Sequence, residues 1–356
     1  MNHRIPVAVL AATGTVGQRF VQLLADHPWF EVKVVTGSER TAGGRYGDGV
    51  NWVMPGRPPA EAADLIVQPT EPNLNVPVVF SALPTQDARE LEPVFAAAGY
   101  VVVTNASAYR MTPDVPLLIP EINPDHTGLI PTQKKNNNWE GYIVASPNCS
   151  TTSAILPMKV LDDAFGLEAA VITTMQAISG AGYPGVSSMD IMDNVVPYIG
   201  GEDEKLEKEP KKLLGTVSNG RLQLADMKIG AQANRVPVID GHLASVSVKL
   251  RRSVSPEEAI EALESWQPPA ISADLPSSPD RVLIYRHEPD RPQPRLDRDN
   301  EKGLAWTVGK VRKCGVLDLR FLSITHNTLR GAASGSLLNA ELLVKQGYIC
   351  RESVIG

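Results

Sequence analysis

The sequence contains little cysteine and no long hydrophobic run. Its three cysteines, Cys149, Cys314 and Cys350, are too few and too widely spaced for a disulfide framework or a zinc site. We therefore expect no bound metal and a reducing compartment. No stretch approaches the roughly 18 apolar residues that span a membrane, and the first residues enter a strand-like run without a signal-peptide core. These features predict a cytoplasmic protein with no membrane partner.

The chain also lacks an excess of positive charge. Its 34 Lys and Arg residues against 40 Asp and Glu residues give a formal net charge of −6, which argues against a nucleic-acid partner. Hydrophobic residues make up 43% and charged residues 21% of the 356 residues, as in ordinary globular proteins, and this length suggests two domains. If the ligands are phosphates, local positive sites must hold them against the average charge.

Short apolar runs alternate with helical spacing in the first part of the chain. We expect strands at residues 5–12, 32–36, 65–68, 78–82 and 101–104, with helices after the first and the fourth. Alternating strands and helices form parallel crossover units. This pattern predicts an α/β fold with an N-terminal doubly wound (Rossmann-like) parallel sheet.

The pattern changes after about Cys149, where longer segments of alternating character begin. We expect strands at residues 170–178, 243–250, 304–311 and 317–324, which indicates a mixed sheet with one face covered. Ser255, followed by Pro and two Glu residues, predicts a helix start. Residues 286–299 are expected to form a loop, and residues 328–346 a final helix. The second part therefore reads as an α+β domain.

A glycine-containing turn at residues 11–17 connects the first expected strand to the first helix. Gly14 lets the backbone approach a phosphate, and Gly17 lets the helix pack on the strand. The amides at the helix N-terminus then face an anion. Because a strand precedes the turn and a helix follows it, a dinucleotide site is favoured over a tight turn without a ligand. Its other expected cofactor-binding residues are Thr13, Thr15 and Val16.

The end of the second strand bears on the choice of cofactor. NAD sites usually have an acidic residue there. Here Ser38, Arg40 and Thr41 could hold a 2′-phosphate by charge-assisted hydrogen bonds, although Glu39 lies among them. We predict NADP.

Residues 146–152, Ser-Pro-Asn-Cys-Ser-Thr-Thr, place Cys149 between a strand and a helix start. The free amides and dipole of a helix N-terminus stabilise a thiolate, which attacks acyl carbons far better than a thiol. Cys149 is therefore the candidate nucleophile, and the alternative is a small buried cysteine. The proton carrier is left open on physical grounds, because His242 and His326 are comparable candidates.

Five motifs occur in an order that resembles the aspartate-semialdehyde dehydrogenase family, most closely its archaeal and fungal branch. They are Thr13-Gly14-Thr15-Val16-Gly17, Asn105-Ala106-Ser107-Ala108-Tyr109-Arg110, Pro147-Asn148-Cys149-Ser150-Thr151, Gln176-Ala177-Ile178-Ser179-Gly180-Ala181-Gly182 and Asp240-Gly241-His242.

The resemblance implies roles for individual residues. Cys149 matches the family nucleophile, His242 its acid/base, and Gln176 the residue that orients the acyl intermediate. Arg235 matches an arginine that grips the substrate carboxylate and Arg110 a phosphate-binding arginine. Further substrate contacts are implied for Asn148, Glu202 and Lys205, although residues 200–212 could equally form a solvated helix face. Further cofactor contacts are implied for Ser81, Leu83, Ser179, Gly180 and Asn327.

The resemblance also implies a domain arrangement and an assembly. Residues 1–148, joined by a returning C-terminal segment 327–356, would form the dinucleotide-binding domain, and residues 149–326 the catalytic and dimerisation domain. A homodimer or homotetramer is implied. The family usually has glycine where this chain has Ala11, and alanine fits there if its φ is negative.

The implied activity is NADPH-dependent conversion of L-aspartyl 4-phosphate to L-aspartate 4-semialdehyde through a cysteine thioester, in the biosynthesis of lysine, threonine and methionine. Malonyl-CoA reductases resemble this branch closely, and N-acetylglutamyl-phosphate reductases and glyceraldehyde-3-phosphate dehydrogenases share the chemistry. A non-catalytic NADP-binding sensor is the alternative from another class, but it leaves Cys149, His242 and Arg235 without a shared purpose.

Overall fold

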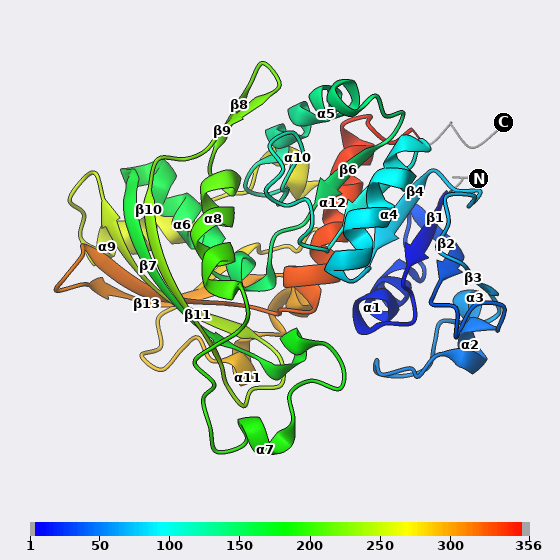
Figure 1. The fold of residues 1–356 in the computed structure, drawn as a ribbon. Helices are drawn as coiled ribbons and strands as arrows, with labels where there is room; N and C mark the ends of the chain where they lie inside the picture. Colours follow the sequence, from blue (N-terminus) through cyan, green and yellow to red (C-terminus); the bar gives the residue numbers. More distant parts are fainter. Residues whose placement is uncertain (1–3, 351–356) are drawn as a thin grey trace.

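The computed structural model describes residues 4–350, and the ends of the expected N- and C-terminal segments lie outside that range. Figure 1 shows two sheets side by side, with the early part of the chain on one side and the middle part on the other. A separate two-stranded hairpin projects from the molecule. It consists of β8 (Thr216–Ser218) and β9 (Arg221–Gln223).

The first sheet has six strands in the order β3-β2-β1-β4-β5-β6, and every neighbouring pair is parallel. Strands β1, β4, β5 and β6 are almost entirely buried, which explains why they read as continuous apolar runs. The predicted doubly wound sheet is therefore confirmed. The strands are β1 (Ile5–Leu10), β2 (Phe30–Thr36), β3 (Val67–Gln68), β4 (Val78–Ser81), β5 (Val101–Thr104) and β6 (Tyr142–Ala145).

The strand order reverses at β1, which pairs with β2 on one side and β4 on the other. Ligands of open parallel sheets bind in the crevice outside the carboxyl ends of such strands. The glycine turn follows β1, and Leu83 follows β4, so both lie at this edge. The helices of this half are α1 (Thr15–Leu24), α2 (Tyr46–Gly49), α3 (Ala60–Ala63), α4 (Thr85–Ala97) and α5 (Ile130–Asn137).

The second sheet is mixed, with the order β10-β7-β11-β14-β13-β12. Its outer pairs, β10 with β7 and β12 with β13, are parallel, and the inner pairs are antiparallel. The predicted mixed sheet is confirmed. The strands are β7 (Leu167–Gln176), β10 (Lys228–Arg235), β11 (His242–Leu250), β12 (Leu283–Arg286), β13 (Trp306–Lys313) and β14 (Leu319–Thr325).

Helix α6 (Cys149–Phe165) packs on the second sheet and against its neighbours α8 (Glu202–Leu213) and α9 (Pro256–Ser265). Helix α8 also packs along β10, as Figure 1 shows. The predicted start of α9 is confirmed, because Ser255 and Glu258 form a reciprocal capping box. Two short helices lie in this half, α7 (Ser188–Ile191) and α11 (Pro294–Asp297). A third, α10 (Ala270–Ala273), packs with its Ile271 against the hydrophobic core of the first sheet.

The final helix begins later than the sequence predicted. Residues 329–333 form an irregular turn in which Ala332 leaves the helical region, with φ −147° and ψ −107°. Helix α12 (Ser334–Lys345) follows and packs beside α1 and β5 of the first half. Its Leu337, Leu338 and Leu342 belong to the hydrophobic core of the first sheet. The C-terminal segment thus completes a core built mostly from the N-terminal third.

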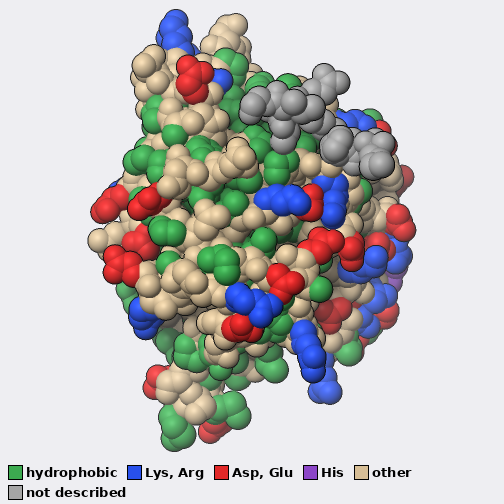
Figure 2. All heavy atoms as spheres, turned by 90° about the vertical axis from the view of Figure 1, so that its right-hand side faces the viewer, with side chains coloured by type: hydrophobic (Ala, Val, Ile, Leu, Met, Phe, Trp, Pro, Cys, Tyr) green, Lys and Arg blue, Asp and Glu red, His purple; other side chains and the backbone are tan. Residues whose placement is uncertain are grey.

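Figure 2 shows one face of the molecule, where acidic and basic side chains are interspersed. Within residues 4–350, no helix is both long and apolar enough to cross a membrane. The described part of the chain also contains no cluster of three or more His, Cys, Asp or Glu side chains arranged to hold a metal ion.

Candidate active site

Cys149 is the first residue of α6, and Asn148 before it is extended, with φ −61° and ψ 144°. The chain leaves β6 at its carboxyl end, turns through Pro147 and starts the helix at once. The first amides of a helix have no partners within it, so the N-terminus of α6 presents donors around the sulfur. Cys149 is partly exposed and lines a cavity.

The structure brings His242 to Cys149 and thereby separates the two histidine candidates. His242 Nε2 lies 3.2 Å from Cys149 Sγ. The imidazole is fully buried at the start of β11, and its Nδ1 accepts a 3.1 Å hydrogen bond from the Ala177 amide. The proton of the neutral ring therefore lies on Nε2 and points to the sulfur. His326 lies instead near Asp299, with Nε2 3.9 Å from its carboxylate.

Burial keeps both members of this pair neutral. It raises the pKa of the Cys149 thiol to about 12, with the Glu202 carboxylate acting in the same direction and the charges of Arg110, Arg235 and Lys205 opposing it. Burial, together with the Arg235 charge, lowers the pKa of His242 to about 3. The sequence predicted a resting thiolate. Burial opposes that charge, and Cys149 Sγ lies 3.5 Å from Asn148 Oδ1, which can accept the proton of the neutral thiol.

Two glycines allow the backbone to approach this pair closely. A Cβ atom on Gly180 would lie 2.8 Å from Arg235 Nη1 and 3.0 Å from His242 Cε1. A Cβ atom on Gly331 would lie 2.8 Å from the Cβ atom of Cys149. Gly331 was not among the predicted site residues, although it lies in the irregular turn before α12.

Helix α8 directs acidic side chains toward the start of α6. Glu202 Oε2 accepts hydrogen bonds from Asn148 Nδ2 (2.7 Å), Ser150 Oγ (2.9 Å) and Gln176 Nε2 (3.1 Å), and Lys205 Nζ donates to Oε1 at 2.8 Å. Burial disfavours the charge of Glu202, but the bonds from Lys205, Asn148 and Gln176 outweigh it and lower its pKa to about 2. This face of α8 is therefore part of the site rather than solvated.

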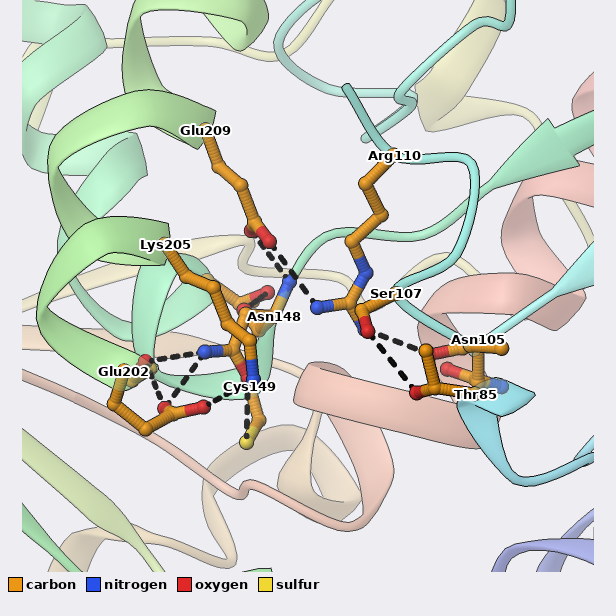
Figure 3. Close-up of polar contacts among 12 residues, drawn as sticks. Thr85, Asn105, Ser107, Arg110, Asn148, Cys149, Glu202, Lys205 and Glu209 are labelled. Atoms are coloured by element: carbon orange, nitrogen blue, oxygen red, sulfur yellow. Dashed lines mark hydrogen bonds and ion pairs between the residues drawn. The ribbon is translucent and has the colours of Figure 1, made fainter. Parts of the chain in front are cut away.

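Two arginines reach the site from different elements. Arg110 follows β5 and donates from Nη2 to Asn105 O (2.7 Å) and from Nη1 to Glu209 (3.1 Å), as Figure 3 shows for Glu209. Its Nε and the side-chain amide nitrogen of Asn105 are buried without a partner. Arg235 ends β10 beside Gln176 and donates from Nη1 to Ala177 O (2.7 Å). Unpartnered donors at Arg110 and Asn105 suit an anionic ligand.

The glycine turn and the nucleophile share one cavity of about 220 Å³. Thr15 and Val16 line it at the start of α1, and Cys149 lines its other side. An overlapping hollow of about 460 Å³ extends it to Leu83 and Lys205. Predicted residues that line one or both are Thr15, Val16, Leu83, Arg110, Asn148, Cys149, Ser179, Gly180, Glu202, Lys205 and Asn327.

The turn has a geometry that only small residues permit. Gly14 is the N-cap of α1, and a Cβ atom on Gly17 would lie 2.3 Å from Ala11 O. The close approach leaves the α1 amides facing the cavity, which fits an anionic dinucleotide. Ala11 has φ +56°, so the condition under which alanine would fit this turn without strain is not met. Hydrogen bonds from Ala11 N to Thr36 Oγ1 (3.3 Å) and from Tyr46 to Ala12 O (2.9 Å) hold this left-handed turn.

The remaining predicted cofactor-binding residues lie in different surroundings. Asn327 donates to Ser179 Oγ (2.8 Å) and accepts from the Gly241 amide (2.8 Å), so it ties the final segment to the loop before His242. Ser81 does not line the cavity. Its hydroxyl donates to Glu92 (2.7 Å) behind the sheet. Of the other candidates, Thr13 and Gly14 lie in the glycine turn. Ser38, Arg40 and Thr41 lie on the surface just after β2.

Comparisons with known proteins agree with this geometry. Family models for the semialdehyde dehydrogenase NAD-binding domain and dimerisation domain match residues 6–130 and 158–330. An aspartate-semialdehyde dehydrogenase of Archaeoglobus fulgidus is 52% identical, covering 97% of this chain and all of the relative. One of Schizosaccharomyces pombe is 45% identical, covering 96% of this chain and 99% of the relative.

A solved structure gives the same result. The chain is similar to the crystal structure of aspartate-semialdehyde dehydrogenase with NADP from Candida albicans, with a TM-score of 0.90 and 40% identity over 97% of this chain and 100% of that chain. The archaeal and fungal resemblance seen in the motifs is therefore confirmed over nearly the whole length. On this sequence identity, and with a cysteine and a histidine meeting at the mouth of a dinucleotide crevice, the chain belongs to the aspartate-semialdehyde dehydrogenase family.

Proposed function

We propose that the protein converts L-aspartyl 4-phosphate to L-aspartate 4-semialdehyde with NADPH, through an acyl thioester on Cys149. The observation that carries this proposal is the 3.2 Å contact between Cys149 Sγ and His242 Nε2 in a cavity that also contains the glycine turn. The names of the Archaeoglobus and Schizosaccharomyces relatives support the substrate. The pathway is the synthesis of lysine, threonine and methionine, in the cytoplasm.

NADP is the proposed cofactor, supported by the NADP named for the Candida structure. The α1 amides after Gly14 would hold the pyrophosphate, and Ser38, Arg40 and Thr41 the 2′-phosphate. Asn327, Ser179 and Gly180 surround the space next to His242, where a nicotinamide would lie. Bound NADPH supplies the hydride that reduces the thioester carbon. Ser81 is left without a direct role, because its hydroxyl is bound to Glu92.

In the first half-reaction, Cys149 Sγ attacks the acyl carbon. The thioester bond forms, the bond to the phosphate oxygen breaks, and the thiol proton leaves with the phosphate. The amides at the start of α6 stabilise the oxyanion. When the sulfur is released in the second half-reaction, the His242 Nε2–H group hydrogen-bonds to the departing thiolate, and a proton taken up from solvent returns it to the thiol. Gln176, held by Glu202, orients the acyl group.

Charged side chains select the substrate in this proposal. Arg235 holds the substrate carboxylate, since a planar guanidinium suits a carboxylate with two bonds. Arg110, with its unpartnered Nε, and Lys205 hold the phosphate. Asn148 and Glu202 are the other two residues proposed to contact the substrate. These cations form the local positive site that a protein of net charge −6 needs.

We also propose that residues 1–148 with the returning C-terminal segment form the cofactor domain, and that residues 149–326 form the catalytic domain and the contacts of a homodimer or homotetramer. The dimerisation-domain match at residues 158–330 supports an assembly. So does the arm around α7, where Met189 is 87% and Tyr198 75% exposed. Large apolar side chains at such exposure favour burial against another chain. Figure 2 shows hydrophobic side chains at the lower end, where this arm projects.

The test follows NADPH formation from aspartate semialdehyde and phosphate by its absorbance, with NAD and NADP compared. Malonyl-CoA reduction is measured alongside, because a related acyl-CoA reductase is the second candidate. We expect turnover with the semialdehyde that requires phosphate and prefers NADP. Turnover with malonyl-CoA alone would overturn the proposal, and cofactor binding without either reaction would favour a sensor.

A further inference from the structure

Helix α8 carries a second buried carboxylate that none of the roles above uses. Glu209 follows Glu202 by seven residues, which is two helical turns, so both side chains lie on one face. Glu209 is 2% exposed and does not line the cavity. It therefore cannot be a substrate contact in this conformation. A buried carboxylate is costly unless it is paired and hydrogen-bonded, so its partners define its purpose.

The two oxygens of Glu209 bind two different parts of the site. Oε1 accepts from Arg110 Nη1 at 3.1 Å, and Oε2 accepts from the backbone amide of Asn148 at 2.7 Å. Figure 3 shows the carboxylate between these groups, reaching down from α8. One acidic side chain thus connects the loop after β5 with the residue that precedes the nucleophile.

Glu209 fixes the orientation of Arg110. With Nη1 on Glu209 and Nη2 on Asn105 O, the guanidinium can turn only slightly, and its Nε stays without a protein partner. Glu209 also fixes the amide of Asn148, while Glu202 binds the side chain of the same residue at 2.7 Å. The start of α6 is therefore held from two sides by one helix.

We propose that Glu209 is a positioning residue, which places Arg110 to receive the phosphate group and holds the start of α6 so that Cys149 faces it. This inference rests on the proposed function, in which Arg110 binds phosphate. It makes phosphate binding at Arg110 and the reactivity of Cys149 depend on one carboxylate that touches neither the substrate nor the sulfur.

The test compares Glu209→Gln with Glu204→Gln, the same chemical change at an exposed position of the same helix. The side-chain oxygen of a glutamine can accept one of the two hydrogen bonds. Its NH₂ group cannot accept the other, because it is itself a donor. Loss of one charge-assisted hydrogen bond predicts a KM for phosphate about tenfold higher in Glu209→Gln, with a lower kcat. The KM for NADP should change less than about twofold, because Glu209 bonds to Arg110 and Asn148 and to no residue of the glycine turn. Glu204→Gln should match the wild type.

A double-mutant cycle separates positioning from a general structural role. If Glu209 acts on phosphate through Arg110, adding Glu209→Gln to Arg110→Gln should raise the KM for phosphate no further. Effects that multiply in the double variant would overturn the proposal, as would a Glu209→Gln enzyme whose only defect is a lower melting temperature. Glu209→Asp serves if Glu209→Gln does not fold, since it keeps the charge but shortens the reach.

A second readout does not depend on turnover. Iodoacetamide alkylation of Cys149 is followed by mass spectrometry with increasing inorganic phosphate. We expect phosphate to protect the wild type and Glu204→Gln, and the half-protecting concentration to rise about tenfold in Glu209→Gln. An enzyme that is protected but inactive toward aspartate semialdehyde would contradict the proposed function and leave the role of Glu209 standing. Absence of protection in the wild type, or equal protection in Glu209→Gln, would overturn the proposed role of Glu209.

Discussion

His242 points its protonated Nε2 at Cys149 Sγ, 3.2 Å away, because the Ala177 amide occupies Nδ1. The ring can become an imidazolium only by losing that amide bond, and burial raises the pKa of Cys149 and lowers that of His242, which favours the neutral form of both groups. The pair thus differs from a preformed thiolate–imidazolium pair. The thiol must therefore lose its proton when ligands bind, either because a bound ligand accepts that proton or because its charge lowers the pKa of the thiol.

The pH dependence of Cys149 alkylation tests this neutral pair. Burial raises the pKa of the thiol to about 12, so its thiolate fraction without ligands should grow about tenfold per pH unit up to at least pH 9. Iodoacetamide alkylation rates measured from pH 6 to 9.5 should follow that slope. A rate that levels off below pH 8 would show that the resting enzyme already contains a thiolate.

Replacing Cys149 with alanine tests the nucleophile. Without the sulfur no thioester can form, so turnover of aspartate semialdehyde should fall by roughly a thousandfold or more. NADP binding, measured by fluorescence titration, should stay close to that of the wild type, because the change is small and the glycine turn is untouched. Cys350→Ala, at an exposed position, is the matched control and should retain full activity. Substantial turnover by Cys149→Ala would refute the mechanism.

Gly331→Ala tests the close approach of the final segment to the nucleophile. The added Cβ would lie 2.8 Å from the Cys149 Cβ atom, so backbone must move on one side. Misplacing a reacting group by a fraction of an ångström predicts a loss of kcat of about tenfold to a hundredfold. Gly230→Ala is the control, because nothing lies within 4 Å of its added Cβ. Equal kcat values for the two variants would mean that the turn containing Gly331 can shift without displacing Cys149.

Ala11→Gly should stabilise the protein. Alanine in the left-handed region costs about 1–2 kcal/mol, whereas the greater freedom of glycine in the unfolded chain costs about 0.5–1 kcal/mol. The net gain should be about 0.5–1 kcal/mol, seen as a higher midpoint in thermal unfolding. Ala98→Gly, at an exposed position with φ −78°, should not raise it. A lower midpoint for Ala11→Gly would indicate that the methyl group contributes more by packing than its backbone strain costs.

The sequence predicted the first sheet well because its central strands are buried on both faces and read as plain apolar runs. Strand β10 was not predicted. It lies at a sheet edge, and its Gly, Ala, Gln and Asn residues have low strand propensity, so only pairing with β7 identifies it. The late start of α12 was also not predicted, since apolar residues continue at helical spacing back to Leu329. The irregular turn reflects the close approach of Gly331 to Cys149.

Some residues of the site could be predicted from the sequence and others could not, for a physical reason. Cys149 could be found because a strand and a helix flank it in sequence. Glu209 could not, because its partners Arg110 and Asn148 are distant in sequence, and a segment rich in Glu and Lys looks like a solvated helix face. Its spacing of two turns from Glu202 was the one available signal. The left-handed φ of Ala11 was not predictable from the sequence, because tertiary hydrogen bonds impose a backbone conformation that alanine alone disfavours.

The packing of α12 into the first core has a consequence for how the protein is made. A ribosome synthesises the strands of the nucleotide-binding half first, yet Leu337, Leu338 and Leu342, which close their core, follow only after the whole second sheet. Apolar surface of the early half therefore stays uncovered until α12 has been synthesised. A translation product interrupted before α12 would expose that surface to chaperones.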